Sequence, residues 1–373
     1  MAKKQIKKSG GSKGKKTAKP TPPAIDEAFL NTLLTTPSPT GREAPLQDKV
    51  EAQVKPFADK TIRDSFGNLT AIVNEGGSPR VMLAGHADEI GMQIKYIDDK
   101  GFLWINALGG IDTSVYTGRQ VDILAKGGVV SGVLGKRPIH LMTAKDLEKA
   151  PELSKMWIDI GAKDGDDAKK LVTIGDPVVL KSELFSIGGS LRVSRAFDDK
   201  AGVYVIMEAA RLAKDYKAKA EIYAVATAQE EIGTRGAIVS SYQSDAGIGF
   251  AVDVSFATDY PGEDKKLIGD FKLGGGPIIT RGPNINPKLF DYIIATAEKH
   301  HIPVQIHACP RPTGTDARSM QLARGGMAVG LISIPLRYMH TPVETISLDD
   351  LALCVELLAR CIAGLDKTTS FAL

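Results

Sequence analysis

Segments with helical spacing alternate with short apolar segments along most of this chain, and this alternation limits the possible folds more than any other feature. Apolar residues at helical spacing are found in residues 25–35, 42–57, 198–216, 287–300 and 347–365. Strand-like apolar runs occupy residues 68–74, 80–94, 220–228, 248–256 and 324–335. Strands that alternate with helices imply a mostly parallel sheet with helices on both faces. The sequence therefore predicts an α/β fold.

A different pattern interrupts this rhythm between residues 95 and 186. Short alternating runs such as "GFLWINAL", "RQVDILA" and "VVSGVLG" are separated there by glycine-rich turns, and only "DAKKLVTI" is helix-like. This pattern is typical of a small all-β module. We therefore predict one α/β domain, formed by residues 25–94 and 187–373, with a β domain inserted at 95–186.

The charge of the chain is concentrated at its start. Residues 1–20 hold eight lysines and no acidic residue, so their removal from a net charge of +3 leaves −5 for the rest. Such a segment cannot bury enough surface to order itself, and we predict a disordered basic tail at residues 1–24. A basic tail can touch nucleic acid, but a solvated tail that aids solubility is the preferred explanation, so no nucleic-acid partner is required.

Composition also limits the location of the protein. No apolar run reaches the roughly 18 residues of a membrane span, so no membrane association is expected. The basic start lacks the apolar centre of a secretory signal. Three cysteines, an odd and sparse set, do not suggest a disulfide framework. These features predict a cytoplasmic protein.

Polar residues follow or end several predicted strands, where ligands of open α/β sheets bind. The segments concerned place His86, Asp88 and Glu89, Asp198 and Asp199, Glu230 and Glu231, Asp253, and His340. Each has a structural explanation, as a core histidine, a helix cap or a loop residue. Asp253 is the hardest to explain this way, because it lies within an apolar run and an unpaired buried carboxylate is costly.

Imidazoles and carboxylates that converge on one edge suit a metal site for zinc, cobalt or manganese. Two divalent ions carry a charge of about +4, which three carboxylates and one hydroxide balance. A single ion would leave excess negative charge in a cleft of low dielectric. The expected cofactor is therefore a pair of divalent ions about 3.5 Å apart, an arrangement used for hydrolysis.

Six segments carry a resemblance to a known family, and they occur in the order "GHADEIG", "AFDDKAG", "QEEIGTRGA", "DVSFATDYPG", "PTGTDA" and "RYMHTPVE". Together they resemble the tetrahedral and glutamyl aminopeptidases, a family of dinuclear metallo-aminopeptidases in which some relatives carry endoglucanase names. The resemblance extends from about residue 26 to the C-terminus. It implies an α/β/α sandwich catalytic domain with an inserted PDZ-like β-barrel used for dimerisation. It also implies assembly into dimers, and in some members dodecamers.

The resemblance also implies a role for each site residue. The metal ligands would be His86, Asp198, Glu231, Asp253 and His340, with Asp198 as the bridge between the ions. Glu231 would share one ion with His340, and Asp253 would share the other with His86. Glu230 would be the general base for a metal-bound water, while Asp88 would orient His86. Thr315 and Asp316 are possible substrate-pocket residues. The expected reaction removes single N-terminal residues from peptides with a free amino end.

Three other functions stay open at this point. A glycoside hydrolase needs two carboxylates about 5–9.5 Å apart, but neither the two histidines nor Asp253 would serve that chemistry. A related metal-dependent deacylase or carboxypeptidase would use a similar cluster on other substrates. A scaffold with a vestigial cluster is the non-enzymatic alternative, and the presence of Glu230 opposes it. The preferred N-terminal residue is not readable from the sequence.

Overall fold

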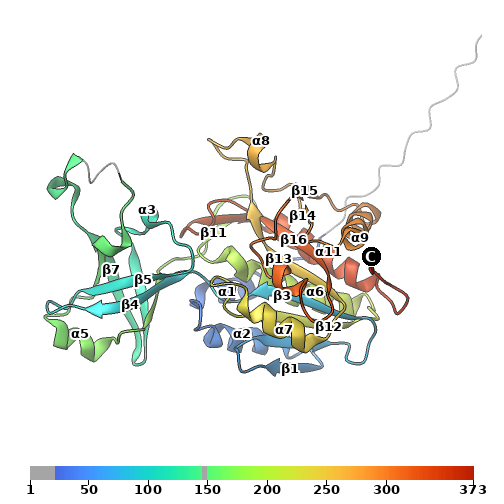
Figure 1. The fold of residues 1–373 in the computed structure, drawn as a ribbon, viewed down its shortest axis with the longest axis horizontal. Helices are drawn as coiled ribbons and strands as arrows, with labels where there is room; N and C mark the ends of the chain where they lie inside the picture. Colours follow the sequence, from blue (N-terminus) through green and yellow to red (C-terminus); the bar gives the residue numbers. More distant parts are fainter. Residues whose placement is uncertain (1–21, 145–148) are drawn as a thin grey trace, which may run out of the picture.

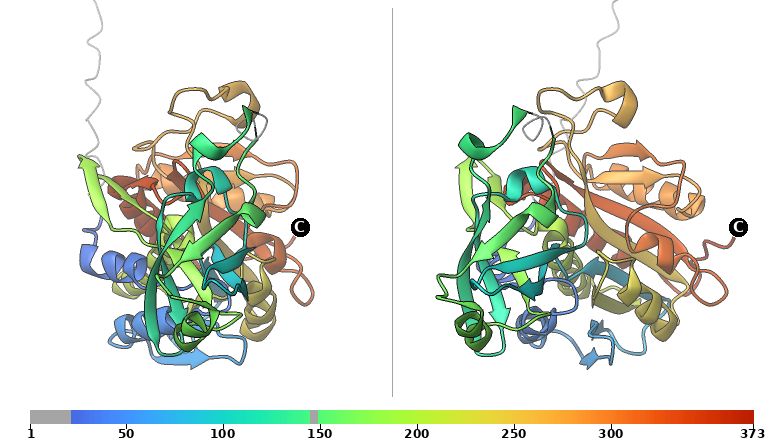
Figure 2. Two further views of the ribbon diagram at one scale, coloured as in Figure 1. Left: turned by 90° about the vertical axis from the view of Figure 1, so that its left-hand side faces the viewer. Right: turned by 60° about the vertical axis from the view of Figure 1, so that its left-hand side comes forward.

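The structure is a computed structural model that describes residues 22–144 and 149–373, arranged as a large body and a small one (Figures 1 and 2). Most of the predicted basic tail lies outside the described residues. The large body consists of a twisted sheet with helices on both faces, and the small body is a β-barrel. This arrangement confirms the predicted α/β fold class with a β insertion.

The sheet of the large body has eight strands, and its centre is parallel. Strands β12, β3, β13 and β16 pair in parallel, while β1 and β2 at one edge and β14 against β16 are antiparallel. The order across the sheet is β1 (Lys60–Arg63), β2 (Leu69–Val73), β12 (Glu221–Thr227), β3 (Arg80–His86), β13 (Ile248–Phe256), β16 (Ala328–Leu336), β14 (Ile278–Arg281) and β15 (Gln305–Ala308). The four central strands therefore present their carboxyl ends at one edge.

Two glycines show how helices cover opposite faces of this sheet. Gly85 in β3 lies against the backbone of Gly202 in α6, whereas Gly249 in β13 faces the side chains of Met320 and Met327 near α10. Gly249 pairs with Met82 and shares its face of the sheet, whereas Gly85 is three residues further along β3. Because side chains alternate between faces along a strand, Gly85 and Gly249 point to opposite faces. The main helices are α1 (Glu27–Thr35), α2 (Ala44–Val54), α6 (Phe197–Asp215), α7 (Arg235–Ser244), α9 (Pro287–Lys299), α10 (Ala317–Met320) and α11 (Leu348–Ala363).

The small body is a closed barrel of six strands with its own hydrophobic core. Its strands are β4 (Gly91–Ile97), β5 (Leu103–Leu108), β6 (Gln120–Ala125), β7 (Gly128–Lys136), β8 (Met156–Asp159) and β9 (Pro177–Leu180). Short helices accompany them at α3 (Thr113–Tyr116) and α5 (Gly165–Leu171), with 3-10 turns at Ile139–Leu141 and Leu153–Lys155. The first barrel strand begins at Gly91, four residues before the predicted start of the insertion at 95, and the proposed domain limits stay a prediction.

A third, smaller sheet begins soon after the last barrel strand in the chain, and the sequence patterns did not indicate it. It contains β10 (Phe185–Gly188), β11 (Leu191–Ser194) and β17 (Glu344–Ser347), all antiparallel. Strand β11 leads directly into α6, so this sheet fixes the approach of the chain to Asp198. The short helix α8 (Lys265–Ile268) lies on an outer loop (Figure 1). Among the described residues, no helix combines the length and apolar character that a membrane crossing requires.

Candidate metal centre

The candidate site lies at the carboxyl ends of the central strands, where the sequence analysis placed it. His86 is the last residue of β3, and it pairs with Thr227, the last residue of β12. Glu230 and Glu231 follow three and four residues later in a turn. Asp253 lies inside β13, and His340 follows β16. The parallel sheet therefore gathers residues that are more than 250 positions apart in the chain.

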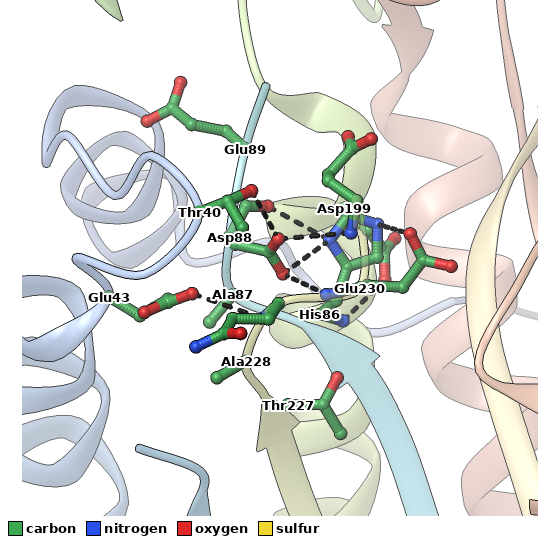
Figure 3. A network of polar contacts seen from close by, with 12 residues as sticks. Thr40, Glu43, His86, Ala87, Asp88, Glu89, Asp199, Thr227, Ala228 and Glu230 are labelled. Carbon is green, nitrogen blue, oxygen red and sulfur yellow. Dashed lines mark hydrogen bonds and ion pairs between the residues drawn. The ribbon is translucent and has the colours of Figure 1, made fainter. Parts of the chain in front are cut away.

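His86 is buried and lies between two carboxylate residues (Figure 3). Its Nε2 is 3.1 Å from Oδ1 of Asp198, and its Nδ1 is 3.0 Å from the carbonyl oxygen of Asp88 and 3.5 Å from Oδ1 of the same residue. The Asp88 carboxylate accepts hydrogen bonds from the backbone N–H groups of Glu230 and Glu231 and from the Thr40 hydroxyl. Asp88 therefore contacts both the imidazole and the turn that carries the two glutamates.

The Asp198 carboxylate lies between the two histidines. Its Oδ1 contacts His86, and its Oδ2 is 3.3 Å from Nε2 of His340. Nε2 of His340 is also 3.7 Å from Oε1 of Glu231. One carboxylate that contacts two imidazoles through different oxygens has the arrangement expected of a bridging ligand. Asp198 is the second residue of α6, where the backbone angles of Asp198 and Asp199 are non-helical, and the peptide bond between these two residues is cis.

Two groups of potential ligands share His86. The ligand atoms of His86, Asp198 and Glu231 all lie within 4.8 Å of one another, and the same holds for His86, Asp199 and Asp253. Asp199 was not among the residues assigned as ligands from the sequence. Its carboxylate accepts the backbone N–H groups of His86 and Gly202, so backbone donors already occupy it. Within the second group, Asp253 is therefore the carboxylate that remains available as a ligand beside His86.

The carboxylates of the cluster raise each other's proton affinity. Burial raises the pKa of Glu230 to about 8 and that of Glu231 to about 9, and neighbouring carboxylates, including Asp88 and Asp198, add to both shifts. Burial and nearby negative charge raise the pKa of Asp253 well above its ordinary value. Buried acids so close together need a positive charge among them to ionise.

Contacts between the histidines and Asp198 shift their pKa values toward the charged forms. Burial alone lowers the pKa of His86, but its contacts with Asp198 and Asp88 raise that pKa well above the ordinary value. Burial opposes ionisation of Asp198, yet hydrogen bonds from His340 and His86 lower its pKa. Oε1 of Glu231 is buried and has no hydrogen-bond partner among the described residues. An unpaired carboxylate oxygen among imidazoles and further acids fits a site for divalent cations.

Glu344 is a buried acid next to the cluster that the sequence analysis did not assign. Its carboxylate accepts the backbone N–H of Asp198 at 3.1 Å and that of His340 at 2.9 Å. It therefore holds the main chain of two candidate ligands. In the sequence, the one indication of a role for Glu344 was its position four residues after His340, at the end of the segment "RYMHTPVE".

Three further residues named in the sequence analysis differ in their contacts with the cluster. They are Glu89, Thr315 and Asp316. Glu89 forms ion pairs with Arg195 and with the fully buried Lys200, and it belongs to neither group of potential ligands. Thr315 lines the cavity beside the metal ligands. Asp316 lies beneath, where its Oδ2 accepts the Thr227 hydroxyl at 2.5 Å, and burial raises its pKa to about 6.

Comparison with known proteins agrees with this geometry. Residues 67–357 match the family model described as M42 glutamyl aminopeptidase. This chain belongs to that family. It is 35% identical to a lysyl aminopeptidase of Pyrococcus furiosus over 323 residues, which are 86% of this chain and 92% of the relative.

Solved structures of the same kind superpose well on the chain. A TET aminopeptidase from a marine sediment Thaumarchaeota archaeon matches with a TM-score of 0.87 and 32% identity, covering 91% of this chain and 96% of that one. The TET1 peptidase of Pyrococcus horikoshii, which assembles into a tetrahedron or a large octahedral shell, matches with a TM-score of 0.82 and 30% identity, covering 91% and 99%. Family membership makes the chain a peptide hydrolase with aminopeptidase function, and peptidases of this family are metal-dependent.

Proposed function

We propose that this protein removes single N-terminal residues from peptides with two divalent ions and with Glu230 as general base. The observation that carries the proposal is the Asp198 carboxylate, which contacts His86 through one oxygen and His340 through the other. Asp198 would bridge the two ions, with Glu231 and His340 on one and His86 and Asp253 on the other. Zinc, cobalt and manganese all suit these ligands.

The ions would supply two effects when bound, a lower pKa for a water molecule and polarisation of the scissile carbonyl. Glu230 would be free for proton transfer, because it lines the cavity beside the cluster but belongs to neither group of potential ligands, and Asp88 accepts its backbone N–H. Its carboxylate removes a proton from water while the water oxygen bonds to the carbonyl carbon. Glu230 then delivers that proton to the departing amine as the C–N bond breaks. The acids of the cluster would hold the free α-amine of the substrate.

Replacement of Glu230 by Gln tests this assignment, since Gln keeps the size of the side chain but cannot accept the proton. We expect Glu230→Gln to retain wild-type metal content and to lose at least about 100-fold in kcat. Metal content measured by atomic emission and hydrolysis of aminoacyl anilides are the two readouts. A fully loaded Glu230→Gln protein with near wild-type hydrolysis would show that Glu230 is not the base.

The other candidate activities are separated by substrate and by metal. Membership of a peptidase family disfavours a glycoside hydrolase, and activity that a chelator abolishes and metal restores would exclude it further. Hydrolysis of N-acyl amino acids in preference to aminoacyl anilides would instead indicate a deacylase or carboxypeptidase. The identity of the N-terminal residue is not set by membership, because the family model is described as glutamyl and the Pyrococcus furiosus relative as lysyl.

We also propose that the protein acts as a homo-oligomer, a dimer or a larger assembly such as a dodecamer, in the cytoplasm. The assembly of the TET1 peptidase supports this proposal, and so do apolar side chains exposed on the barrel, Val129, Val133, Ile139 and Leu141. The barrel would then be the dimerisation domain. The three cysteines are free, which suits a reducing compartment.

A further inference from the structure

A cavity of about 280 Å³ extends from the metal cluster over the ends of β13, β14, β15 and β16. The cluster forms one wall. The remaining lining residues, called the neutral wall here, are uncharged, namely Val254, Ser255, Phe256, Thr280, His307, Cys309, Thr313, Gly314, Thr315, Leu331, Ser333 and Met339. A substrate whose amino end and first carbonyl lie at the cluster must direct its first side chain into this space or out to solvent.

The neutral wall carries no formal charge among the described residues that line the cavity. Burial lowers the pKa of His307, so its imidazole is mainly neutral at pH 7. The centroids of the His307 and Phe271 rings are 5.4 Å apart. The Cys309 thiol donates to the carbonyl oxygen of Arg311. The acids and histidines of the cluster are the remaining ionisable groups of the cavity, and the ions would neutralise them.

Several residues of the neutral wall lie in paired strands, which restricts their movement. Thr280 pairs with His307 in the parallel ladder of β14 and β15, and Ser333 pairs with Asp253 across β16 and β13. Thr280 and Ser333 are 2% and 1% exposed. Phe256 is half-exposed, and Met339 is partly buried immediately before the candidate ligand His340. The neutral wall therefore combines polar residues held in paired strands with more exposed apolar side chains, and an uncharged side chain fits such a lining.

We propose that this cavity receives the side chain of the first substrate residue and that its neutral wall selects an uncharged residue, such as leucine or methionine. The inference rests on the proposed aminopeptidase function. A lysine or glutamate side chain would lose its hydration here without gaining an opposite charge. The expected discrimination in kcat/KM is at least about 100-fold in favour of leucine over either charged residue.

A panel of aminoacyl anilides with metal-loaded, full-length protein tests this selection. Fastest hydrolysis of leucine or methionine anilide supports the inference, as does stronger product inhibition by free leucine than by free lysine or glutamate. Fastest hydrolysis of a glutamyl or lysyl substrate overturns the inference but leaves the proposed aminopeptidase function intact. No hydrolysis of any aminoacyl substrate overturns the proposed function itself, and the inference with it.

Two pairs of variants test whether this wall makes the selection. Cys309→Asp adds a carboxylate, and Cys309→Asn is its matched neutral control. We expect the Asp variant to raise the ratio of lysyl to leucyl kcat/KM at least about tenfold over the Asn variant. Met339→Glu and Met339→Gln repeat the comparison at a second position if Cys309→Asp fails to fold. Equal ratios within both pairs, at equal metal content, would overturn the placement of the first residue in this cavity.

Discussion

Most candidate ligands at this site are held through their backbone by a second carboxylate. Buried acids accept the N–H groups of five site residues, with Asp88 holding Glu230 and Glu231, Asp199 holding His86, and Glu344 holding Asp198 and His340. Charge-assisted hydrogen bonds of this kind are stronger than neutral ones. The ligand side chains therefore keep their oxygens and nitrogens free for cations, while the main chain that carries them is fixed.

Glu344 gives the clearest test of this arrangement. Glu344→Gln retains the shape of the side chain but replaces one carboxylate oxygen by an amide that cannot accept a backbone N–H. One of the two bonds, to Asp198 or to His340, must then be lost. We expect metal affinity to fall by about 10- to 100-fold, measured by competition with a chelator, while kcat at saturating metal falls much less.

A matched control for this variant lies on α11. Glu356 is also buried, and it pairs with Arg360 and accepts the Tyr216 hydroxyl away from the cluster. Glu356→Gln should reduce thermal stability without changing metal affinity. Wild-type metal affinity in Glu344→Gln would show that the carboxylate contributes only to folding.

At the scale of elements, the close contact of α6 with β3 brings the two halves of the cluster together. The helix begins next to Asp198 and Asp199, and the strand ends at His86. Gly85 permits the contact, because a Cβ atom there would lie 2.8 Å from the carbonyl carbon of Gly202 and 2.9 Å from the backbone nitrogen of Val203. The absence of a side chain at Gly85 therefore allows the close approach of α6 that places Asp198 beside His86.

We expect Gly85→Ala to cost about 1–3 kcal/mol of stability and to weaken metal binding in addition. The new methyl group meets backbone atoms, so α6 must move away from β3 and carry Asp198 with it. Thermal unfolding of the metal-free protein measures the first effect, and chelator competition measures the second.

Gly249→Ala is the comparison on the neighbouring strand. Its methyl group would meet the flexible ends of Met320 and Met327 on the other face, which can move aside. Metal affinity should stay at the wild-type value there. Equal losses of metal affinity in both variants would mean that general packing of the sheet, and not the α6–β3 contact, sets the site.

Local sequence patterns were sufficient to predict the elements that carry the site, but not all of their partners. Periodicity located α6 and the strands that end near His86 and Glu230, because buried faces repeat at fixed spacing. Glu344 escaped prediction because its partners, the N–H groups of Asp198 and His340, include one 146 positions away. The antiparallel edges and the sheet of β10, β11 and β17 depend on long-range pairing that no local pattern encodes. The first barrel strand followed β3 too closely to be separated from it.

At the scale of the whole molecule, two separate hydrophobic cores support the two bodies, and the cluster lies near the place where they meet. Tyr116 of the barrel approaches Glu89, Glu231 and His340 around one small cleft. Metal binding should therefore stabilise the large body directly and the junction with the barrel as well. In the metal-free protein, the pH dependence of stability then reports on the protons that the cluster binds.

The protons bound by the cluster make the free energy of unfolding of the metal-free protein fall between pH 7 and pH 8. Glu230 and Glu231, with pKa values raised to about 8 and about 9, hold protons that the unfolded chain has released. Stability falls with rising pH wherever the native state binds more protons. Lys200, whose pKa burial lowers to about 8, has the opposite effect but loses at most half a proton in this range. Each excess native proton contributes about −1.4 kcal/mol per pH unit to the free energy of unfolding.

We expect urea unfolding of chelator-treated protein to give a lower free energy of unfolding at pH 8 than at pH 7, by about 1 kcal/mol or more. Saturating manganese or cobalt should displace these protons and remove or reverse the slope, because ions that bind the native state alone stabilise it. Glu231→Gln, which cannot titrate, should show a shallower slope than the wild-type protein without metal. A free energy of unfolding that rises from pH 7 to pH 8 in the metal-free wild type would contradict a cluster of protonated, uncompensated acids.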